Sequence, residues 1–564
     1  MTGAQIVIEC LLEQGVDTIF GYPGGTVLNI YDQLFKNSSR IRHILTAHEQ
    51  GAAHAADGYA RSSGRTGVVL ATSGPGATNL VTGLATAYMD SIPLVAITGN
   101  VPSHLLGRDS FQEVDITGIT MPITKHNFIV RKVEDLADSL RKAFIIAGSG
   151  RCGPVLVDIP KDLTVQECEW KAASPEHLAA LRSALDLKSS PHPTAASLQQ
   201  AADLIRQAKR PLLYAGGGVI ASAASAELRT LAERILSPVA LSLMGHGAFP
   251  ANHPLCTGLI GMHGTKASNM AASQADLIVA LGARFSDRVT SNTQRFAPGA
   301  QILHIDIDPA EINKNIQSYH SLKGDVKQVL RLLLDLIPQR EVSAWNGDIK
   351  DWKAIHPSSH EPGRHLHPRY IMEETHTKVP ADTIITTEVG QHQMWTAQFY
   401  PFSKPRTFLS SGGLGTMGFG TGAAIGAQVA NPDQQVVHFA GDGSFRMNCT
   451  ELATIAHYKL PVLIVVMNNG CLGMVRQWQK LFYEGRYSET TLDRGPDFLK
   501  LADAYGLPAW RAGTEGEFTA ALNEALSERR PALIECIIES DEDVLPIVPS
   551  GKPIEEQILE TVKM

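Results

Sequence analysis

The chain of 564 residues has few of the features that mark secreted, membrane-spanning or nucleic-acid-binding proteins. Its seven cysteines are scattered, and none has the CxxC spacing of a zinc site or a redox motif. Such usage is typical of reduced thiols in a cytoplasmic protein and argues against a disulfide framework. No apolar run reaches the roughly 20 residues of a membrane span. A helical pattern starts almost at once, over 4–14, without a signal or transit segment, so we expect a cytoplasmic protein with no membrane partner.

Concentrated charge of one sign is missing as well. The net charge is −8, the isoelectric point lies near 6.2, and no basic run is present, which argues against nucleic acid as a partner. Low-complexity tracts and sequence repeats are also lacking. At about 150 residues per domain, the length predicts three or four domains with large cores. The composition is that of a soluble α/β enzyme.

Apolar, β-rich runs alternate with helical patterns in three parts of the chain, which predicts an α/β fold of three doubly wound parallel sheets. In the first unit, 1–165, strands are expected at 18–20, 41–46, 68–71, 94–98, 128–130 and 155–159. In the second, 191–340, they are expected at 211–215, 239–243, 277–281 and 302–305. In the third, 368–564 with a C-terminal tail, they are expected at 382–386, 407–410, 436–440, 462–467 and 532–538. The stretches 166–190 and 341–367 lose the pattern and are predicted to be linkers.

The most informative stretch is 436–469, which reads as strand, loop, helix and strand, with the helix over 450–458. Such a crossover joins parallel strands, so Asp442 of Gly-Asp-Gly and Asn469, 27 residues later, should meet at the carboxyl edge of one sheet. A carboxylate and an amide oxygen suit a Mg²⁺ that takes its other ligands from a phosphate. The helix start after Asn448 can face a diphosphate. A tight turn at Gly-Asp-Gly and a cap at Asn469 are the alternatives.

This pair of motifs resembles the thiamine diphosphate motif of the enzymes that depend on this cofactor. Longer runs resemble the catalytic subunits of the acetohydroxyacid synthase, or acetolactate synthase, family. They are FGYPGG (20–25), AHEQGAAHAADGYAR (47–61), ATSGPGATNL (71–80), GPVLVDIPKD (153–162), GMHGTKA (261–267), VGQHQMW (389–395), GGLGTMGFG (412–420) and GMVRQWQKLFYEGRYSET (473–490). The resemblance implies pyrimidine-binding, central FAD-binding and diphosphate-binding domains, in this order, and thiamine diphosphate, Mg²⁺ and FAD as cofactors.

Glu49 lies where a strand ends and a helix begins, a position that the helix dipole alone favours for glutamate. The resemblance implies that Glu49 is the acid that contacts the aminopyrimidine of the cofactor, a task that a buried carboxyl with a raised pKa suits. It also assigns Gln112 and Lys125 to the catalytic region, beside Phe111 in the access channel. A solvated surface role is the alternative for Lys125. The glycine-rich loop 73–79 lacks the lysine of a P-loop and is expected to shape the site.

The resemblance implies further contacts of the third unit with the cofactor. Met417 would fold it into a V shape, although a core methionine is the alternative, and the Cys471 backbone carbonyl would complete the metal ligands Asp442 and Asn469. The residues expected to contact thiamine diphosphate besides Glu49 are Gly390, Gln391, His392, Gly415, Met417, Gly441, Gly443, Ser444 and Met474.

In the second unit, glycines follow a strand and an acid ends a later strand, as in dinucleotide-binding domains, but GxGxxG is absent. The resemblance makes FAD the expected ligand. Its expected contacts are Arg151, Gly216, Gly217, Gly218, His263, Gly264, Thr265, Gly282, Ala283, Arg284, Asp306 and Asp325.

Substrate residues are also implied: Met262, Phe111, Arg288 for a 2-ketoacid carboxylate, and Trp478 for the second ketoacid. One extra methyl group in such a pocket is worth roughly 1–3 kcal/mol, so a preference for 2-ketobutyrate over pyruvate is expected.

Two departures from the family pattern stand out. Thr421-Gly422 replaces a residue followed by proline, which is expected to loosen the helix after Gly420. Cys449 and Cys471 lie near the metal loop, where they would make the protein sensitive to oxidation.

The resemblance implies a transferase that condenses pyruvate with pyruvate or 2-ketobutyrate, in the first common step of branched-chain amino acid synthesis. It further implies a homodimer or dimer of dimers with active sites at the subunit interface, and a small regulatory subunit. The alternatives are a flavin-independent catabolic acetolactate synthase, another carboligase or oxidase of this superfamily, and a catalytically silent relative.

Overall fold

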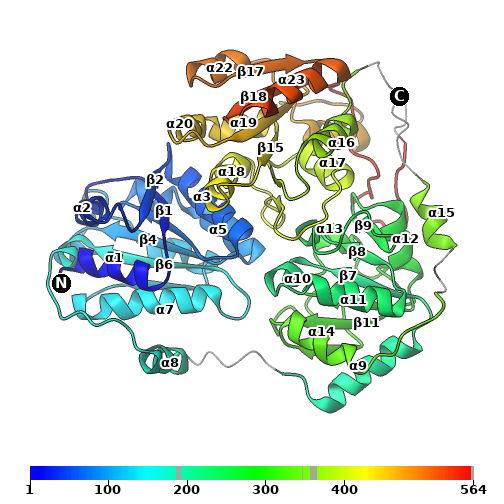
Figure 1. The fold of residues 1–564 in the computed structure, drawn as a ribbon, viewed down its shortest axis with the longest axis horizontal. Helices are drawn as coiled ribbons and strands as arrows, with labels where there is room; N and C mark the ends of the chain where they lie inside the picture. Colours follow the sequence, from blue (N-terminus) through cyan, green and yellow to red (C-terminus); the bar gives the residue numbers. More distant parts are fainter. Residues whose placement is uncertain (186–191, 344, 346, 356–364, 561–564) are drawn as a thin grey trace.

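The computed structural model describes residues 1–185, 192–343, 345, 347–355 and 365–560. Some predicted segments lie partly outside these ranges. They are the first linker at 186–190, the second linker at 344, 346 and 356–364, and the last four residues of the predicted third unit. The described chain forms three sheets of six strands, and all strand pairs within them are parallel. The predicted fold class is confirmed. In Figure 1 the first unit lies on the left, the middle unit at the lower right and the third unit at the top.

The first sheet has the order β2-β1-β3-β4-β6-β5. Its strands are β1 (Thr18–Gly21), β2 (Arg42–Leu45), β3 (Gly67–Ala71), β4 (Leu94–Asn100), β5 (His126–Ile129) and β6 (Pro154–Pro160). Its helices are α1 (Gly3–Glu13), α2 (Leu28–Lys36), α3 (Glu49–Ser63), α4 (Pro75–Thr78), α5 (Val81–Asp90), α6 (Ile116–Thr120) and α7 (Leu136–Gly148).

The middle sheet has the order β12-β11-β10-β7-β8-β9. Its strands are β7 (Pro211–Ala215), β8 (Val239–Leu241), β9 (Cys256–Leu259), β10 (Leu277–Leu281), β11 (Gln301–Asp306) and β12 (His320–Lys323). Its helices are α9 (Ala195–Gln207), α10 (Gly217–Ala221), α11 (Ser225–Ile235), α12 (Lys266–Gln274), α13 (Asp287–Thr290) and α14 (Val326–Leu334). Read from β9, this is the strand order 3-2-1-4-5-6 of dinucleotide-binding folds, whose two halves meet between β7 and β10.

The third sheet has the order β14-β13-β15-β16-β18-β17, which repeats the topology of the first sheet without a visible sequence repeat. Its strands are β13 (Ile384–Thr387), β14 (Phe408–Leu409), β15 (Val436–Gly441), β16 (Val462–Asn468), β17 (Ala509–Ala512) and β18 (Ala532–Ile537). Its helices are α16 (Pro368–Lys378), α17 (Gln391–Phe399), α18 (Phe419–Ala430), α19 (Asp442–Asn448), α20 (Leu452–His457), α21 (Gly473–Phe482), α22 (Phe498–Ala504) and α23 (Glu515–Ser527).

Both predicted linkers contain a short helix. These are α8 (Pro175–Ala184) and α15 (Asp348–Lys353). Helix α8 begins with proline at its first position, after Ser174, whose side chain accepts the His177 N–H. Such a start signal needs no apolar periodicity, which explains why the pattern analysis missed this helix.

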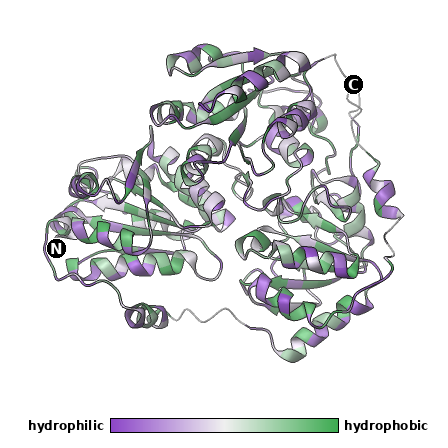
Figure 2. Cartoon of the chain, viewed as in Figure 1, coloured by the Kyte–Doolittle hydropathy of each residue, from purple (hydrophilic) through white to green (hydrophobic). Residues whose placement is uncertain are grey.

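The central strands are apolar on both faces because helices cover both faces of each sheet. Figure 2 shows hydrophobic residues concentrated on these strands and polar residues on the outer helices. One core cluster runs through both the first and the third unit. It includes α3 and α18, whose backbones approach closely, since a Cβ on Gly422 would lie 2.7 Å from that of His54. The first and third units are therefore packed as one body.

Helix α18 runs unbroken over Phe419–Ala430, and its first turn is hydrogen-bonded through Thr421 to the Glu388 carboxylate. This contact, distant in sequence, supports the start of the helix. The expected loosening of the helix after Gly420 stays a prediction.

Candidate functional site

The carboxyl ends of β15 and β16 lie side by side, with Gly441 paired to Met467. Asp442 and Asn469 follow these ends and both line one cavity, as the motif predicts. The helix predicted over 450–458 is present as α20, after a 3₁₀ turn at Cys449–Glu451. The predicted loop before it is wrong, because an additional helix, α19, begins at Asp442 itself. The glycines suggested a turn, but Gly443 fits the first helical turn, where a Cβ would lie 2.7 Å from the Leu472 side chain.

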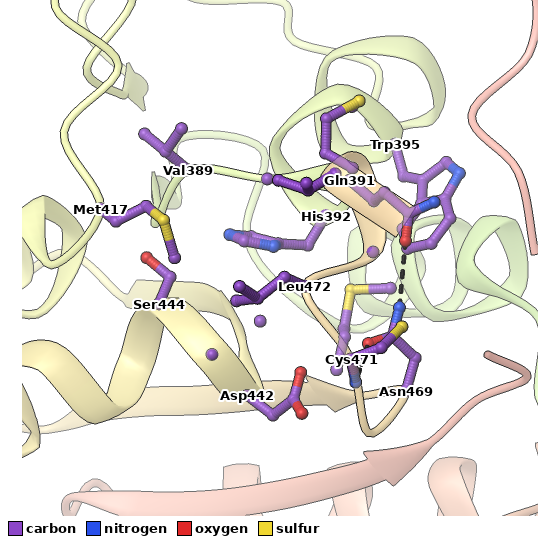
Figure 3. A pocket seen from close by; sticks show the side chains of 17 residues that line it. Val389, Gln391, His392, Trp395, Met417, Asp442, Ser444, Asn469, Cys471 and Leu472 are labelled. Atoms are coloured by element: carbon purple, nitrogen blue, oxygen red, sulfur yellow. Dashed lines mark hydrogen bonds between the residues drawn. The ribbon is translucent and has the colours of Figure 1, made fainter. Parts of the chain in front are cut away.

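Figure 3 shows the cavity, whose described lining residues all come from the third unit. It collects the predicted cofactor and metal residues Gly390, Gln391, His392, Met417, Gly441, Asp442, Gly443, Ser444, Asn469, Cys471 and Met474. Trp395 and Leu472 also line it, and the motifs alone did not assign them. Gly415 is not among the lining residues, and its positive φ of 71° explains the glycine locally.

The metal half of the cavity offers oxygen ligands. Burial raises the pKa of Asp442 to about 6, although hydrogen bonds from backbone N–H groups such as that of Gly443 act to lower it. Asn469 Oδ1 accepts the Cys471 N–H at 3.2 Å and keeps a second lone pair. No group of three or more His, Cys, Asp and Glu that could hold a metal occurs within the described ranges. A cation here would need backbone, water and phosphate oxygens, which suits Mg²⁺.

The side chain of Gln391 is committed to the protein. Its Oε1 accepts a hydrogen bond from Asn469 Nδ2 at 3.0 Å, and its Nε2 donates to Gln477 Oε1 at 3.1 Å and to the Glu542 carbonyl at 2.9 Å. Gln391 lines the cavity, and its expected contact with the diphosphate stays a prediction. Its side chain also orients the amide of Asn469, a contact that motif matching could not show.

His392 carries an unsatisfied polar atom in the same cavity. Its Nε2 is buried without a partner, and burial lowers the pKa of the imidazole to about 4, so the ring is neutral at neutral pH. Figure 3 shows the ring between Met417 and Asn469. In the tautomer that carries its proton on Nε2, this neutral imidazole is a hydrogen-bond donor that fits a phosphate oxygen. The cavity therefore fits a metal-bound diphosphate.

Glu49 is the first residue of α3, and its side chain is buried. Its Oε2 accepts a hydrogen bond from Asn79 Nδ2 at 3.0 Å, so the end of the glycine-rich loop orients the acid. The preceding N–H groups of Ala47 and His48 each donate to Glu451 of the third unit at 3.1 Å. The loop 73–79 was expected to shape the site, but the contact of Asn79 with Glu49 was not predicted and Glu451 was not assigned. Glu49 is not among the described residues that line the cavity of its own chain.

The remaining first-unit residues lie away from this cavity. Lys125 precedes β5, at the amino edge of the sheet opposite Glu49, and its Nζ donates to the carbonyls of Ile146 at 2.5 Å and Ser149 at 2.7 Å. Phe111 is 88% exposed. Gln112 has a positive φ of 59° and packs on the glycine-rich loop. Within one chain, Lys125 and Glu49 do not share a site.

In the middle unit, Gly216 follows β7 and Gly282 follows β10, on either side of the switch point of the sheet. The backbones of Gly218 and Gly282 touch, since a Cβ on Gly218 would lie 2.6 Å from Gly282 Cα. Asp306 ends β11 beside them, and burial raises its pKa to about 6. Ligands bind at such switch points, and the expected FAD residues Gly216, Gly218, Gly282 and Asp306 lie together at this one.

Several residues assigned to FAD or substrate have protein partners. Arg151 donates to Ser91, Asp308 and Glu311, and Arg284 donates to the Met89 carbonyl, so both arginines join the first and middle units.

The segment 262–265 meets the third unit. The His263 imidazole contacts the Pro546 carbonyl at 3.3 Å, and Thr265 caps α12. Arg288 contacts the Met262 sulfur at 3.5 Å and keeps most of its surface exposed.

Further residues occupy helix starts and faces. Gly217 begins α10, Asp325 caps α14 through the Gln328 N–H, and the Ala283 carbonyl lies 3.0 Å from the His304 ring. Trp478 lies one turn after Met474 on α21 and packs on Phe482.

The cysteines near the metal loop are not activated thiols. Burial raises the pKa of Cys471 to about 12 and also raises that of Cys449. Since the thiolate is the form that is oxidised, the expected oxidation sensitivity loses its chemical basis.

Comparisons with known proteins agree with this geometry. Family models of thiamine pyrophosphate enzymes match residues 1–119 (N-terminal TPP binding domain), 198–333 (central domain) and 388–536 (C-terminal TPP binding domain). The probable acetolactate synthase large subunit of Methanocaldococcus jannaschii is 48% identical over 98% of this chain and 94% of its own length. The acetolactate synthase isozyme 2 large subunit of Escherichia coli is 45% identical over 99% of both chains. An acetolactate synthase of Mycobacterium leprae is 48% identical over 99% of this chain and 90% of its own.

The fold, the cavity and the three matches define a thiamine pyrophosphate enzyme, whose cofactor is also called thiamine diphosphate. Within that class, the chain belongs to the acetolactate synthase large-subunit family. No helix of the described residues is long and apolar enough to cross a membrane.

Proposed function

We propose that this chain condenses pyruvate with a second 2-ketoacid, pyruvate or 2-ketobutyrate, with loss of CO₂. The products would be 2-acetolactate and 2-aceto-2-hydroxybutyrate, in the first common step of valine, leucine and isoleucine synthesis. The main structural support for this proposal is one cavity, which brings together Asp442, Asn469 and the unpartnered Nε2 of His392. Near full-length similarity to enzymes named acetolactate synthase supports the choice of reaction.

The residues would divide the work as follows. Asp442, Asn469 and the Cys471 carbonyl would hold Mg²⁺, and His392 would donate its N–H to the diphosphate. Bound thiamine diphosphate supplies the electron sink that makes decarboxylation possible.

Glu49 would hold or move a proton at the aminopyrimidine. Arg288 would receive a ketoacid carboxylate, since its guanidinium is exposed and offers a bidentate face. Trp478 would shape the pocket for the second ketoacid. The first unit would also supply Phe111 to the access channel, and Gln112 and Lys125 to the catalytic region.

The proposed active site is shared by two chains. In one chain Glu49 and the metal cavity are separate, although both lie at carboxyl edges of sheets with the same topology. Two copies related by twofold symmetry would bring each Glu49 to the partner's cavity. We therefore propose a homodimer or a dimer of such dimers, with units 1–165, 191–340 and 368–564 as its pyrimidine-binding, FAD-binding and diphosphate-binding domains.

Mixing two inactive variants tests this arrangement. Glu49→Gln and Asp442→Asn each disable one half of every site in a homodimer. A heterodimer of the two has one site with both halves intact, so co-expression should restore a measurable share of acetolactate formation. No restoration in a demonstrated heterodimer would contradict the shared site.

We propose FAD as the ligand of the crevice between β7 and β10. The test of function is acetolactate formation from pyruvate with thiamine diphosphate and Mg²⁺, before and after FAD removal. Loss of activity without FAD, and its return with FAD or a redox-inert analogue, supports the synthase. Activity indifferent to FAD would favour a catabolic synthase, and stoichiometric oxygen consumption an oxidase. Absence of acetolactate with every cofactor present would contradict the proposed reaction.

Two relatives are named large subunits. We therefore propose a small regulatory subunit as partner and a cytoplasmic location.

A further inference from the structure

Glu388 is a fully buried carboxylate that the motifs did not assign. It follows β13 and directly precedes the cavity-lining segment 389–392. Its side chain is 0% exposed. A buried charge is retained only where hydrogen bonds replace the lost water.

Four hydrogen bonds converge on this carboxylate. Oε2 accepts from the Gly418 N–H at 2.6 Å and from the Ser444 hydroxyl at 2.8 Å. Oε1 accepts from the Thr421 N–H at 3.0 Å and from the Thr421 hydroxyl at 3.2 Å. His438 Nε2 lies 3.6 Å from Oε1. Burial works against ionisation, but the nearby His438 imidazole and the hydrogen bonds from Ser444 and Thr421 hold the pKa of Glu388 below its ordinary value.

Two of these donors belong to the first turn of α18. Gly418 is the residue before the helix and Thr421 is its third residue. Their N–H groups form the positive end of the helix dipole, which a carboxylate stabilises. Two N–H groups at the N-terminus of α18 are therefore satisfied by a charge of the protein itself.

The same contacts reach two cavity residues. Met417 precedes Gly418, whose φ of +87° and N–H bond to Glu388 set the direction in which the methionine leaves the chain. The Gly418 carbonyl is fixed as well, since it accepts from Asn448 Nδ2 at 2.5 Å. Ser444 is held through its hydroxyl. Figure 3 shows Met417 and Ser444 side by side at the cavity.

We propose that Glu388 is a positioning residue, whose buried carboxylate fixes Met417 and Ser444 in the arrangement that binds thiamine diphosphate. This inference rests on the proposed function. Glu388 does not touch the cofactor; it acts through the start of α18 and through Ser444.

The test compares Glu388→Gln with Thr421→Val. Glu388→Gln keeps the shape of the side chain but removes its charge. Its amide NH₂ cannot accept a hydrogen bond and would face two of the four donors. The second removes one hydroxyl donor and leaves the backbone bonds in place, so it keeps the proposal testable if the first variant fails to fold. Glu227→Gln is the control, because Glu227 is a buried glutamate paired with Arg331 in the middle unit.

Titration of each full-length protein with thiamine diphosphate at saturating Mg²⁺ can be followed by tryptophan fluorescence, since Trp395 lines the cavity. We expect the dissociation constant for thiamine diphosphate to rise at least about tenfold for Glu388→Gln, because loss of a residue that supports a ligand-binding group usually costs this much. The rise should be smaller for Thr421→Val. At saturating cofactor, kcat should fall while KM for pyruvate changes little. Glu227→Gln should bind as the wild type does.

A purely structural role predicts something else. In that case Glu388→Gln would lower the unfolding temperature equally with and without the cofactor, and its dissociation constant would match that of the wild type. That result would overturn the proposal. Failure of the wild type to bind the cofactor in the same titration would instead count against the proposed function.

Discussion

Nδ2 of Asn469 donates a hydrogen bond to Oε1 of Gln391 at 3.0 Å, and this contact joins the ends of two strands of the third sheet. The bond leaves Asn469 with its oxygen, the atom that a cation needs, directed away from Gln391. Gln391 is itself held by Gln477 of α21 and by the Glu542 carbonyl of the C-terminal segment. The orientation of one proposed metal ligand therefore depends on three segments distant in sequence.

Replacing Gln391 by leucine should weaken Mg²⁺ binding. Loss of the Oε1 acceptor frees the Asn469 amide to rotate, and removal of such a partner usually costs about 10–100-fold in metal affinity. Magnesium titration of thiamine diphosphate-dependent activity gives the apparent constant. Gln393→Leu is the matched control, because Gln393 is buried on the same helix but donates to Ser410. Equal effects of the two variants would contradict the assigned role.

Glu49→Ala should slow turnover by orders of magnitude, since Glu49 is the acid that we propose to hold or move the proton at the aminopyrimidine. Asn79→Ala should give a smaller loss, about tenfold, because it removes a hydrogen bond that orients Glu49 but keeps the acid. Exchange of the cofactor C2 proton for deuterium, followed by NMR, measures this step without turnover. Near-normal exchange in Glu49→Ala would refute the assignment.

Asp90→Asn should loosen the junction of the units. The Asp90 carboxylate has no exposed surface, pairs with Arg61 at 3.0 Å, and accepts the N–H groups of Gly412 and Gly413 at 3.1 and 2.7 Å. Breaking a buried ion pair costs about 3–5 kcal/mol when the partner charge is left alone, and we expect a loss nearer the lower value because Arg61 keeps Asp57 as a second partner. Unfolding in urea measures the loss.

Asp32→Asn is the control for this variant, because Asp32 pairs with Lys36 on the surface. Exposed pairs of this kind contribute at most about 1 kcal/mol. A similar small effect of both substitutions would show that the Asp90 contacts do not hold the units together.

His246→Phe should make the protein more resistant to acid. Burial lowers the pKa of His246 to about 4 in the folded chain, from 6.5 for an ordinary histidine. Between these values the unfolded chain binds more protons, so stability falls as the pH falls. Each pH unit in this window costs up to about 1.4 kcal/mol for one such group.

The ring of His246 packs against Phe402 and Phe408, where phenylalanine keeps the aromatic contacts. Unfolding temperatures at pH 7 and pH 5 should therefore differ less in His246→Phe than in the wild type. An unchanged difference would mean that His246 is already protonated, or exposed, before unfolding.

Local patterns determined the α/β class, the three parallel sheets and most of their strands. Buried parallel strands are continuous apolar runs, which single-sequence patterns detect well. The missed strands β9, β12 and β17 are short and carry polar residues such as Thr257, His320 and Arg511. Their places at sheet edges are fixed by neighbouring strands, not by their own composition.

The motifs also placed Asp442, Asn469, His392 and Met417 in one cavity, because the ends of parallel strands meet at one edge of a sheet. The sequence by itself thus determined the family, the fold class and most of the residues that line the cavity. Only the tertiary structure decided what holds them, namely Gln391 behind Asn469, Asn79 behind Glu49, and Glu388 behind Met417 and Ser444. These hydrogen bonds join residues about 30 to 80 positions apart, and no local periodicity records which polar side chains meet once the segments are packed.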